Sequence, residues 1–254
     1  MKNIDDKTYS IILPTYNEVG HIEQLINDIY IIFIKKKLDF EIIIVDDGSN
    51  DGTIDKVKNL KNKIKNLELI TRLDKTNSLV DSINDGISFS KFDNIIWFDA
   101  DYSHPPKYLI EMINKKETVN CDLIFYSRFL KESKRYFDNN NKKKKTIDKL
   151  SVYLNKMCNF FLYGDLYDYT SGYILIKSDF FKENKLKGYY GDYFITLLVD
   201  AKLNNLKIIE LPFNELDRRS GVSKTTGNKL NLIIKCFFYL LSIFYNFFRR
   251  LKFF

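Results

Sequence analysis

The amino-acid sequence predicts an α/β fold, in which a mostly parallel sheet is flanked by helices on both faces. Two observations lead to this prediction. Short apolar runs alternate with longer segments of helical spacing over the first half of the 254-residue chain, which is the pattern of repeated strand–helix–strand units. Turn-forming Asp, Gly, Ser and Asn residues follow several of the apolar runs. We expect one such domain over residues 1–228 and a separate C-terminal helix over residues 229–254.

Each apolar run is too short for a helix and is therefore assigned as a strand, and the amphipathic segments between the runs are assigned as helices. The first half of the chain then has strands at residues 9–13, 40–45, 67–71, 95–98 and 123–126, and helices at 22–38, 53–60, 79–89 and 107–113. The second half has helices at residues 150–162 and 194–203 and short strands at 173–176 and 207–211. Residues 131–149 are polar and lack periodicity, so we expect a mobile loop there.

The C-terminal segment differs from the rest because it is rich in Phe, Leu, Ile and Tyr. Its uninterrupted apolar part is shorter than the roughly 20 residues that cross a bilayer. On a helix its polar residues fall on one stripe, which favours an amphipathic, membrane-associated helix with Arg249, Arg250 and Lys252 near the lipid headgroups. The alternative is a helix that packs on the domain or joins two copies in a homo-oligomer. The stripe consists of Asn231, Lys235, Ser242, Asn246 and Arg249.

The composition limits the partners and the compartment. A formal net charge of +7 suits an acidic partner such as a nucleotide or an anionic membrane, although Lys is spread along the whole chain. The basic residues lack the interleaved aromatic residues of a base-stacking surface, so we expect no nucleic-acid partner. The three cysteines have no CxxC spacing, and the N-terminus lacks the apolar core of a signal peptide. A cytoplasmic location, peripheral on the membrane, is therefore predicted.

Acidic residues follow two of the predicted strands, where ligands bind in open α/β sheets. Asp99, Ala100 and Asp101 follow the strand at 95–98, and the two carboxylates are hard ligands suited to Mg²⁺ or Mn²⁺. Short acidic pairs also cap helices, but here a separate helix start at residues 104–106 comes after the pair. Asp47 follows the strand at 40–45 and is placed to accept hydrogen bonds from a nucleotide base or ribose. Neither a Walker lysine nor a GxGxxG motif is present.

These motifs resemble those of family-2 glycosyltransferases, and specifically of the polyprenyl-phosphate mannosyltransferases. The resemblance begins with the segments 9–18, 45–53 and 99–106, and it extends to 127–129, 168–173 and 210–224. It covers roughly residues 9–227 of the chain. It implies a GT-A fold, which is Rossmann-like, and a transfer that inverts the sugar's anomeric configuration.

The resemblance also implies roles for residues at the matching positions. Asp99, Ala100 and Asp101 would lie at the donor diphosphate, with Asp99 and Asp101 as the metal ligands. Arg128 would meet an acceptor phosphate, and Arg218 and Lys224 would reach the donor phosphates. The nucleoside would be held by Pro14, Tyr16, Glu18, Val45 and Asp47.

The function that the resemblance implies is transfer of a hexose, mannose from GDP-mannose, to a polyprenyl or dolichyl phosphate. A phosphate acceptor is already anionic, so such a transfer needs no general base. Two alternatives stay open: a glycosyltransferase that uses a UDP-hexose or a glycan hydroxyl, and a non-catalytic nucleotide-binding relative. Family members carry Gln at Ser103 and Gly at Tyr126, so we expect changes in metal coordination and on the acceptor side, respectively. Of the two histidines, His21 is predicted to be on the surface of a helix and His104 beside the metal site.

Overall fold

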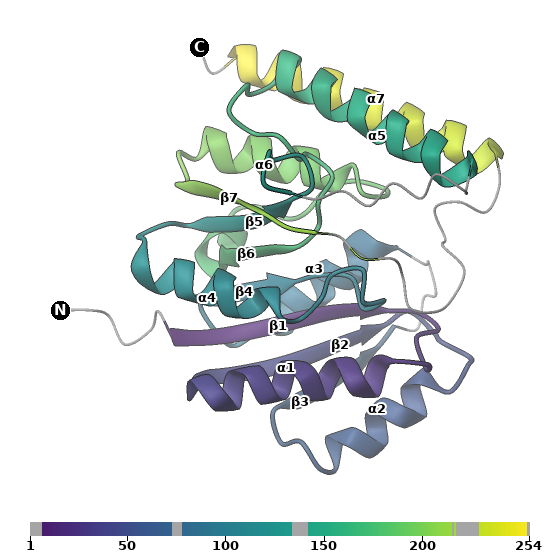
Figure 1. Ribbon diagram of the computed structural model, residues 1–254, viewed down its shortest axis with the longest axis vertical. Coiled ribbons are helices and arrows are strands. Elements are labelled where there is room, and N and C mark those ends of the chain that lie inside the picture. The colour runs from purple at the N-terminus through teal and green to yellow at the C-terminus, as the bar shows by residue number, and fades with distance from the viewer. Residues whose placement is uncertain (1–6, 73–77, 134–141, 215, 217–228, 253–254) are drawn as a thin grey trace.

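The computed structural model describes residues 7–72, 78–133, 142–214, 216 and 229–252, with only the backbone described at 142–146 and 229–231. Within these ranges the chain forms a seven-stranded sheet of order β3-β2-β1-β4-β6-β5-β7 (Figure 1). The predicted α/β fold is confirmed. The strands are β1 (Thr8–Thr15), β2 (Asp39–Asp46), β3 (Leu67–Thr71), β4 (Asn94–Trp97), β5 (Leu123–Ser127), β6 (Ile174–Lys177) and β7 (Ile208–Pro212).

The direction of the strands decides which loops meet. β1 pairs in parallel with β2 and with β4, and β5 pairs in parallel with β7. β6 lies antiparallel between β4 and β5, so β4 and β5 run in the same direction. The segments that follow β1, β2, β4 and β5 therefore leave the sheet along one edge, which is where open α/β sheets bind ligands.

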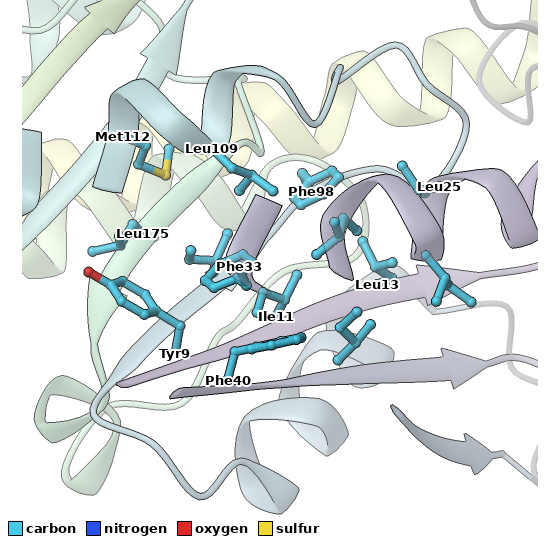
Figure 2. Close-up of a cluster of buried hydrophobic side chains, with 14 of the residues drawn as sticks. Tyr9, Ile11, Leu13, Leu25, Phe33, Phe40, Phe98, Leu109, Met112 and Leu175 are labelled. Atoms are coloured by element: carbon cyan, nitrogen blue, oxygen red, sulfur yellow. The ribbon is translucent and has the colours of Figure 1, made fainter. Parts of the chain in front are cut away.

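Helices cover both faces of the sheet because alternate strand residues point to opposite faces. On β1, Ile11 and Leu13 belong to one buried cluster, which Figure 2 shows with Leu25 and Phe33 of α1. Ile12 belongs to a second cluster on the other face, together with residues of α3 and α6. The helices are α1 (Ile22–Lys36), α2 (Thr53–Lys61), α3 (Leu79–Phe89), α4 (Tyr108–Thr118), α5 (Lys142–Phe161), α6 (Tyr193–Leu203) and α7 (Lys229–Lys252), with a short 3₁₀ helix at Ser178–Lys182.

One glycine sets how closely α3 approaches the sheet. A Cβ atom on Gly86 would lie 2.5 Å from Cγ2 of Ile12, which is far inside van der Waals contact. The backbone of α3 can therefore lie directly on β1 only because this position has no side chain. Ser78 begins the same helix, since its side chain accepts a hydrogen bond from the amide of Asp81.

The loop predicted for residues 131–149 is wrong at its C-terminal end, because α5 begins at Lys142. Lysine is a good helix former, so a run of lysines can be helical without an apolar period in the sequence. Helical spacing becomes visible only where α5 meets the second core cluster, at Leu154, Met157 and Cys158. Residues 134–141 lie outside the described part of the chain.

The C-terminal helix α7 lies beside α5 and over α6 (Figure 1). Ser242 and Asn246 of its polar stripe are buried against the protein, while the side chain of Asn231 lies outside the described part. Asn246 is completely buried, and its Nδ2 donates to Oγ1 of Thr196 at 3.0 Å. Arg249 forms an ion pair with Asp200 of α6 at 2.5 Å, and Arg250 donates to the carbonyl oxygens of residues 161 and 162. Both side chains thus hold α7 on the domain, and the expectation that they lie near lipid headgroups stays a prediction.

The outer side of α7 is apolar. Phe237, Phe244, Tyr245 and Phe248 are each more than half exposed. Of the helices that the structure describes, one segment, Leu232–Lys252, is long and apolar enough to cross a bilayer by length and composition. The helix is thus amphipathic, as the sequence predicts, with its apolar face turned away from the domain.

Candidate active site

The loops that follow β1 and β2 are joined by hydrogen bonds. The amide of Asn17 donates to Oγ of Ser49 at 2.8 Å, and the amide of Asn50 donates to Oδ1 of Asn17 at 3.0 Å. The amide of Glu18 donates to Oγ1 of Thr53 at 2.9 Å. Asn17 has a φ of 59°, a left-handed conformation that asparagine tolerates better than most residues. Turn-forming residues therefore fix the two loops against each other at the sheet edge.

Asp51 takes part in the same loop. It accepts hydrogen bonds from the amide of Val19 and from the amide and hydroxyl of Thr53, at 2.6 to 3.1 Å. Burial alone would raise the pKa of Asp51, but these donors, Thr53 foremost, hold it below its ordinary value. This carboxylate is consequently a structural part of the loop.

Five residues were predicted to hold a nucleoside, and the structure places all five at the carboxyl ends of β1 and β2. Pro14 pairs with Val45 in the register of the two strands, and the side chain of Val45 is fully buried in the core. Tyr16 and Glu18 are half-buried in the loop after β1. Asp47 is 5% exposed beneath them. Val45 has no exposed surface, so its role toward a nucleoside stays a prediction.

The prediction that His21 is a surface residue is wrong. His21 is 5% exposed, and its ring contacts that of Tyr102 edge to face. Its Nε2 lies 3.0 Å from Oε2 of Glu18. His21 therefore orients Glu18 from below, and the acidic neighbour three residues earlier in the sequence was the available signal.

Asp47 has a partner that sequence reasoning missed. Nη1 of Arg72 lies 3.2 Å from Oδ1 of Asp47, and both side chains are buried. Arg72 follows β3, and its Nε also donates to Asp85 of α3 at 2.9 Å. A basic residue directly after the predicted strand 67–71 was the signal in the sequence. The pair fixes the direction of the Asp47 carboxylate under the place proposed for the nucleoside.

The acidic pair follows β4. Oδ1 of Asp101 accepts from the amide of Ser103 at 2.9 Å and from its hydroxyl at 2.6 Å. The amide of Asp99 donates to Nδ1 of His104 at 3.1 Å. Tyr102 lies between these residues with a φ of 65°, which turns the chain sharply after Asp101. Ser103 thus orients Asp101, and His104 orients the backbone at Asp99.

These residues fit a divalent cation that shares its coordination with a substrate. Among the described residues, no three His, Cys, Asp or Glu side chains are grouped as a metal site would require. Asp99 and Asp101 supply two carboxylates at one strand end, and Mg²⁺ is commonly bound by one or two carboxylates together with substrate phosphates. The donor set therefore suits a cation that binds with a diphosphate.

Arg128, which follows β5, is held by a buried carboxylate. Its Nε donates to Oδ2 of Asp168 at 2.8 Å, and its Nη2 donates to Oδ1 of Asp168 at 3.0 Å. Nη2 also lies 2.7 Å from Oγ1 of Thr170. Asp168 is fully buried; burial alone would raise its pKa, but the Arg128 guanidinium holds the pKa below its ordinary value. Such a two-point pair fixes the direction in which the guanidinium points.

A second carboxyl group supports Asp168 from behind. Glu210 of β7 accepts from the amide of Asp168 at 2.9 Å and from the amide of Tyr167 at 3.0 Å. Burial raises the pKa of Glu210 to about 7. The helix α5 is tied to the same segment, because Oδ1 of Asn155 accepts from the amide of Tyr169 at 2.6 Å.

One cavity of about 370 Å³ lies between the sheet edge after β4 and β5 and the helices α5, α6 and α7. Asp99, His104 and Arg128 contribute to its wall at the sheet edge. The rest of the wall comes mainly from apolar and aromatic side chains of three helices. They include Leu150, Leu154 and Met157 of α5, Tyr193 and Phe194 of α6, and Leu232, Tyr239 and Leu240 of α7.

The sequence of this chain matches the family model of glycosyl transferase family 2 over residues 10–184. The chain belongs to this family. A dolichol-phosphate mannosyltransferase of Pyrococcus furiosus is 27% identical over 221 residues, which are 87% of this chain and 60% of that protein. An uncharacterized protein of Methanocaldococcus jannaschii is 28% identical over 229 residues, which are 88% of this chain and 95% of that protein.

A solved structure has the same fold as this family-2 glycosyltransferase. It is the glucosyl-3-phosphoglycerate synthase of Mycobacterium tuberculosis in complex with Mn²⁺, UDP and glucosyl-3-phosphoglycerate. The two chains share 16% sequence identity and superpose with a TM-score of 0.66 over 94% of this chain and 80% of the other. The GT-A fold implied by the motifs is thereby confirmed.

Two other expectations about this glycosyltransferase can be compared with the structure. The ring of Tyr126 is fully buried, and its hydroxyl donates to the carbonyl of Tyr108 at 2.7 Å. It lies in the core under α4, so it does not reshape the acceptor side as expected. Arg218 and Lys224 lie outside the described residues. The nearest described residue before them, Leu216, donates its amide to the carbonyl of Ser103 at 3.2 Å.

Proposed function

We propose that this family-2 glycosyltransferase moves a hexose, mannose from GDP-mannose, to a polyprenyl phosphate. The observation that carries the proposal is the cavity, whose wall contains both Asp99 and Arg128 and is otherwise largely apolar. A soluble sugar acceptor would need polar groups around its hydroxyls, whereas a lipid phosphate needs one cationic region and an apolar path. The Pyrococcus furiosus relative, named a dolichol-phosphate mannosyltransferase, supports the same acceptor.

The donor would bind along the carboxyl ends of β1, β2 and β4. The nucleoside would lie on Pro14, Tyr16, Glu18, Val45 and Asp47, whose loops are already joined by hydrogen bonds. Asp99 and Asp101 would hold Mg²⁺ or Mn²⁺ at the diphosphate, where the cation neutralises charge on the leaving group. Ser103 keeps Asp101 in one orientation for this role.

In the proposed reaction, an oxygen of the acceptor phosphate attacks the anomeric carbon. The bond between that carbon and the donor diphosphate breaks, and the configuration at the carbon is inverted. Arg128 would direct the acceptor phosphate, because Asp168 fixes the guanidinium at two points. Arg218 and Lys224 would contribute positive charge at the donor phosphates. The phosphate nucleophile carries no proton that must be removed, so no general base is assigned.

The apolar side of α7 would rest in a membrane, and the catalytic domain would face the cytoplasm. Exposed aromatic and aliphatic residues on α5 and α7 form a surface of the kind that lies at a bilayer boundary. It includes Tyr153 and Phe160 of α5 and Phe237, Phe244 and Phe248 of α7. In this arrangement the cavity between the two helices is next to the lipid that contains the acceptor.

The proposal is tested with purified protein, a divalent metal, a polyprenyl phosphate and one labelled donor at a time. GDP-mannose, UDP-glucose and UDP-N-acetylglucosamine are compared, and label is followed into the lipid phase. We expect lipid labelling from GDP-mannose and its loss in Asp101→Ala, whose folding is checked by circular dichroism. Transfer to a free glycan hydroxyl, with none to the lipid phosphate, would contradict the proposed acceptor. Lipid labelling from a UDP-sugar would contradict the proposed donor.

A further inference from the structure

The C-terminal helix contributes a basic residue to the cavity. Lys235 of α7 belongs to the cavity wall, and its Nζ lies 4.8 Å from the centre of the Tyr190 ring. The side chain is half-buried. Burial lowers the pKa of Lys235 below its ordinary value, which is the effect of placing an ammonium group among apolar side chains. The charged form of an ammonium group in such surroundings is stabilised when an anion binds beside it.

The charges around the cavity show why a second cation matters. The positive charge of Arg128 is balanced by Asp168, which is fully buried and bonded to it at two points. Asp99 adds a negative charge to the wall. Both charges next to Arg128 in this part of the wall are therefore negative, and a second cationic group would favour the entry of a phosphate. Among the described residues of the wall, Arg128 and Lys235 are the arginine and the lysine.

The neighbours of Lys235 on α7 indicate what kind of anion fits. Leu232, Cys236, Tyr239 and Leu240 also belong to the cavity wall. Their spacing of three or four residues places them with Lys235 on one side of the helix. The charge is thus surrounded by apolar and aromatic groups, which suits an anionic head attached to a hydrocarbon chain better than a free inorganic anion.

We infer that Lys235 binds the phosphate head of the amphiphilic acceptor and thereby makes α7 one wall of the acceptor site. This inference rests on the proposed function for the identity of the acceptor. It adds a specificity-determining residue outside the segment that matches the family model, which ends at residue 184. Arg128 orients the phosphate from the sheet edge, and Lys235 adds a second basic group from the α7 side of the same cavity.

The test uses the full-length chain and three substitutions. Lys235→Met removes the charge and keeps the length of the side chain, and Lys235→Arg keeps the charge. Lys156→Met is the control, because Lys156 lies on the neighbouring helix α5 and is exposed. For Lys235→Met we expect the KM for polyprenyl phosphate to rise about tenfold or more, as for loss of a charge-assisted hydrogen bond, while the KM for the donor changes by less than about twofold. Lys235→Arg should recover most of the loss, and the control should behave like the wild type.

A binding experiment separates this inference from the proposed function. The thermal shift produced by dodecyl phosphate is measured alongside those produced by inorganic phosphate and by a non-ionic dodecyl detergent. We expect a shift with dodecyl phosphate in the wild type that is lost in Lys235→Met. If the wild type does not label polyprenyl phosphate but shows this pattern, the proposed function fails and the anion site stands.

Three results would overturn the inference itself. One is an acceptor KM in Lys235→Met equal to that of the wild type. Another is an equal rise in the KM for the donor, which would place Lys235 at the donor phosphates. The third is a dodecyl phosphate shift that persists in Lys235→Met or is matched by inorganic phosphate. Should Lys235→Met fold poorly, Lys235→Gln replaces it in both measurements.

Discussion

Replacing Asp168 by asparagine would remove the charge that holds Arg128 and keep the shape of the side chain. Asp168 is fully buried, whereas the side chain of Arg128 is 14% exposed. Removing one partner of a buried ion pair costs about 3–5 kcal/mol. Thr170 still accepts from Arg128, at 2.7 Å, so we expect the lower end of this range, about 3 kcal/mol of lost stability. In a chain of this length that corresponds to a fall in Tm of roughly 5–10 °C.

The size of this loss should depend on pH in a defined direction. The pKa of Asp168 is lowered in the folded protein, so its stabilising contribution is complete above its ordinary pKa of about 4 and is lost as the pH falls through the lower folded value. Glu210 lies behind Asp168, and burial raises its pKa to about 7. Above that pH the ionised Glu210 repels the ionised Asp168, which reduces the contribution of Asp168 to the free energy of unfolding. The difference between wild type and Asp168→Asn should therefore be largest near pH 6.

The measurement is urea unfolding at pH 6 and pH 8, with Asp165→Asn as the matched control. Asp165 is 65% exposed in its ion pair with Lys202, and exposed pairs of this kind contribute about 0–1 kcal/mol. We also expect a raised KM for the lipid phosphate in Asp168→Asn, because Arg128 is no longer held in one direction. A loss of stability as small as that of the control would refute the reasoning.

Four further substitutions test other parts of the structure. Glu210→Gln should flatten the pH dependence of stability. The wild type should lose about 1–3 kcal/mol between pH 5 and pH 8, because a carboxyl group with a folded pKa of about 7 ionises in that range. Parallel urea-unfolding profiles of the two proteins against pH would contradict this expectation. Arg72→Met should abolish the Tm rise that GDP gives with Mn²⁺, because Asp47 loses its partner at 3.2 Å, and an unchanged rise would show that the pair is not needed. Asn246→Leu should lower stability by about 1–3 kcal/mol, whereas Phe248→Ser, at an exposed position, should leave stability nearly unchanged and weaken co-sedimentation with anionic vesicles; the reverse pattern would contradict the orientation of α7.

Much of the fold could be predicted because strands buried on both faces leave a simple pattern. The parallel strands β1 and β2 contribute the runs 11–13 and 42–45, every residue of which is fully buried, so each appears as a continuous apolar run. The rule that ligands bind at the carboxyl ends of such strands then led directly to Asp47 and Asp99. Their placement at one sheet edge is confirmed by the strand order, while their roles toward a substrate stay predictions.

Other features depend on contacts between segments far apart in the chain. Arg128 and Asp168 are 40 residues apart, and nothing in the local pattern of either segment indicates the pair. The helical spacing of the C-terminal segment gives a polar stripe but not the direction in which it faces. That direction is decided by Thr196 and Asp200 of α6, which supply the partners for Asn246 and Arg249. The division of the chain at residue 228 also stays a prediction.

The orientation of α7 affects how this protein can be handled in the laboratory. A common route to a water-soluble form is to truncate an apolar C-terminal helix. Here that truncation would remove the ion pair between Asp200 and Arg249 and the hydrogen bond between Thr196 and Asn246. It would also expose part of the second core cluster, because Ile243 would be lost. A truncated chain would lose the exposed apolar side of α7 but would expose an apolar part of the core. A detergent or nanodisc that covers the outer side of the helix is therefore the better choice for purification.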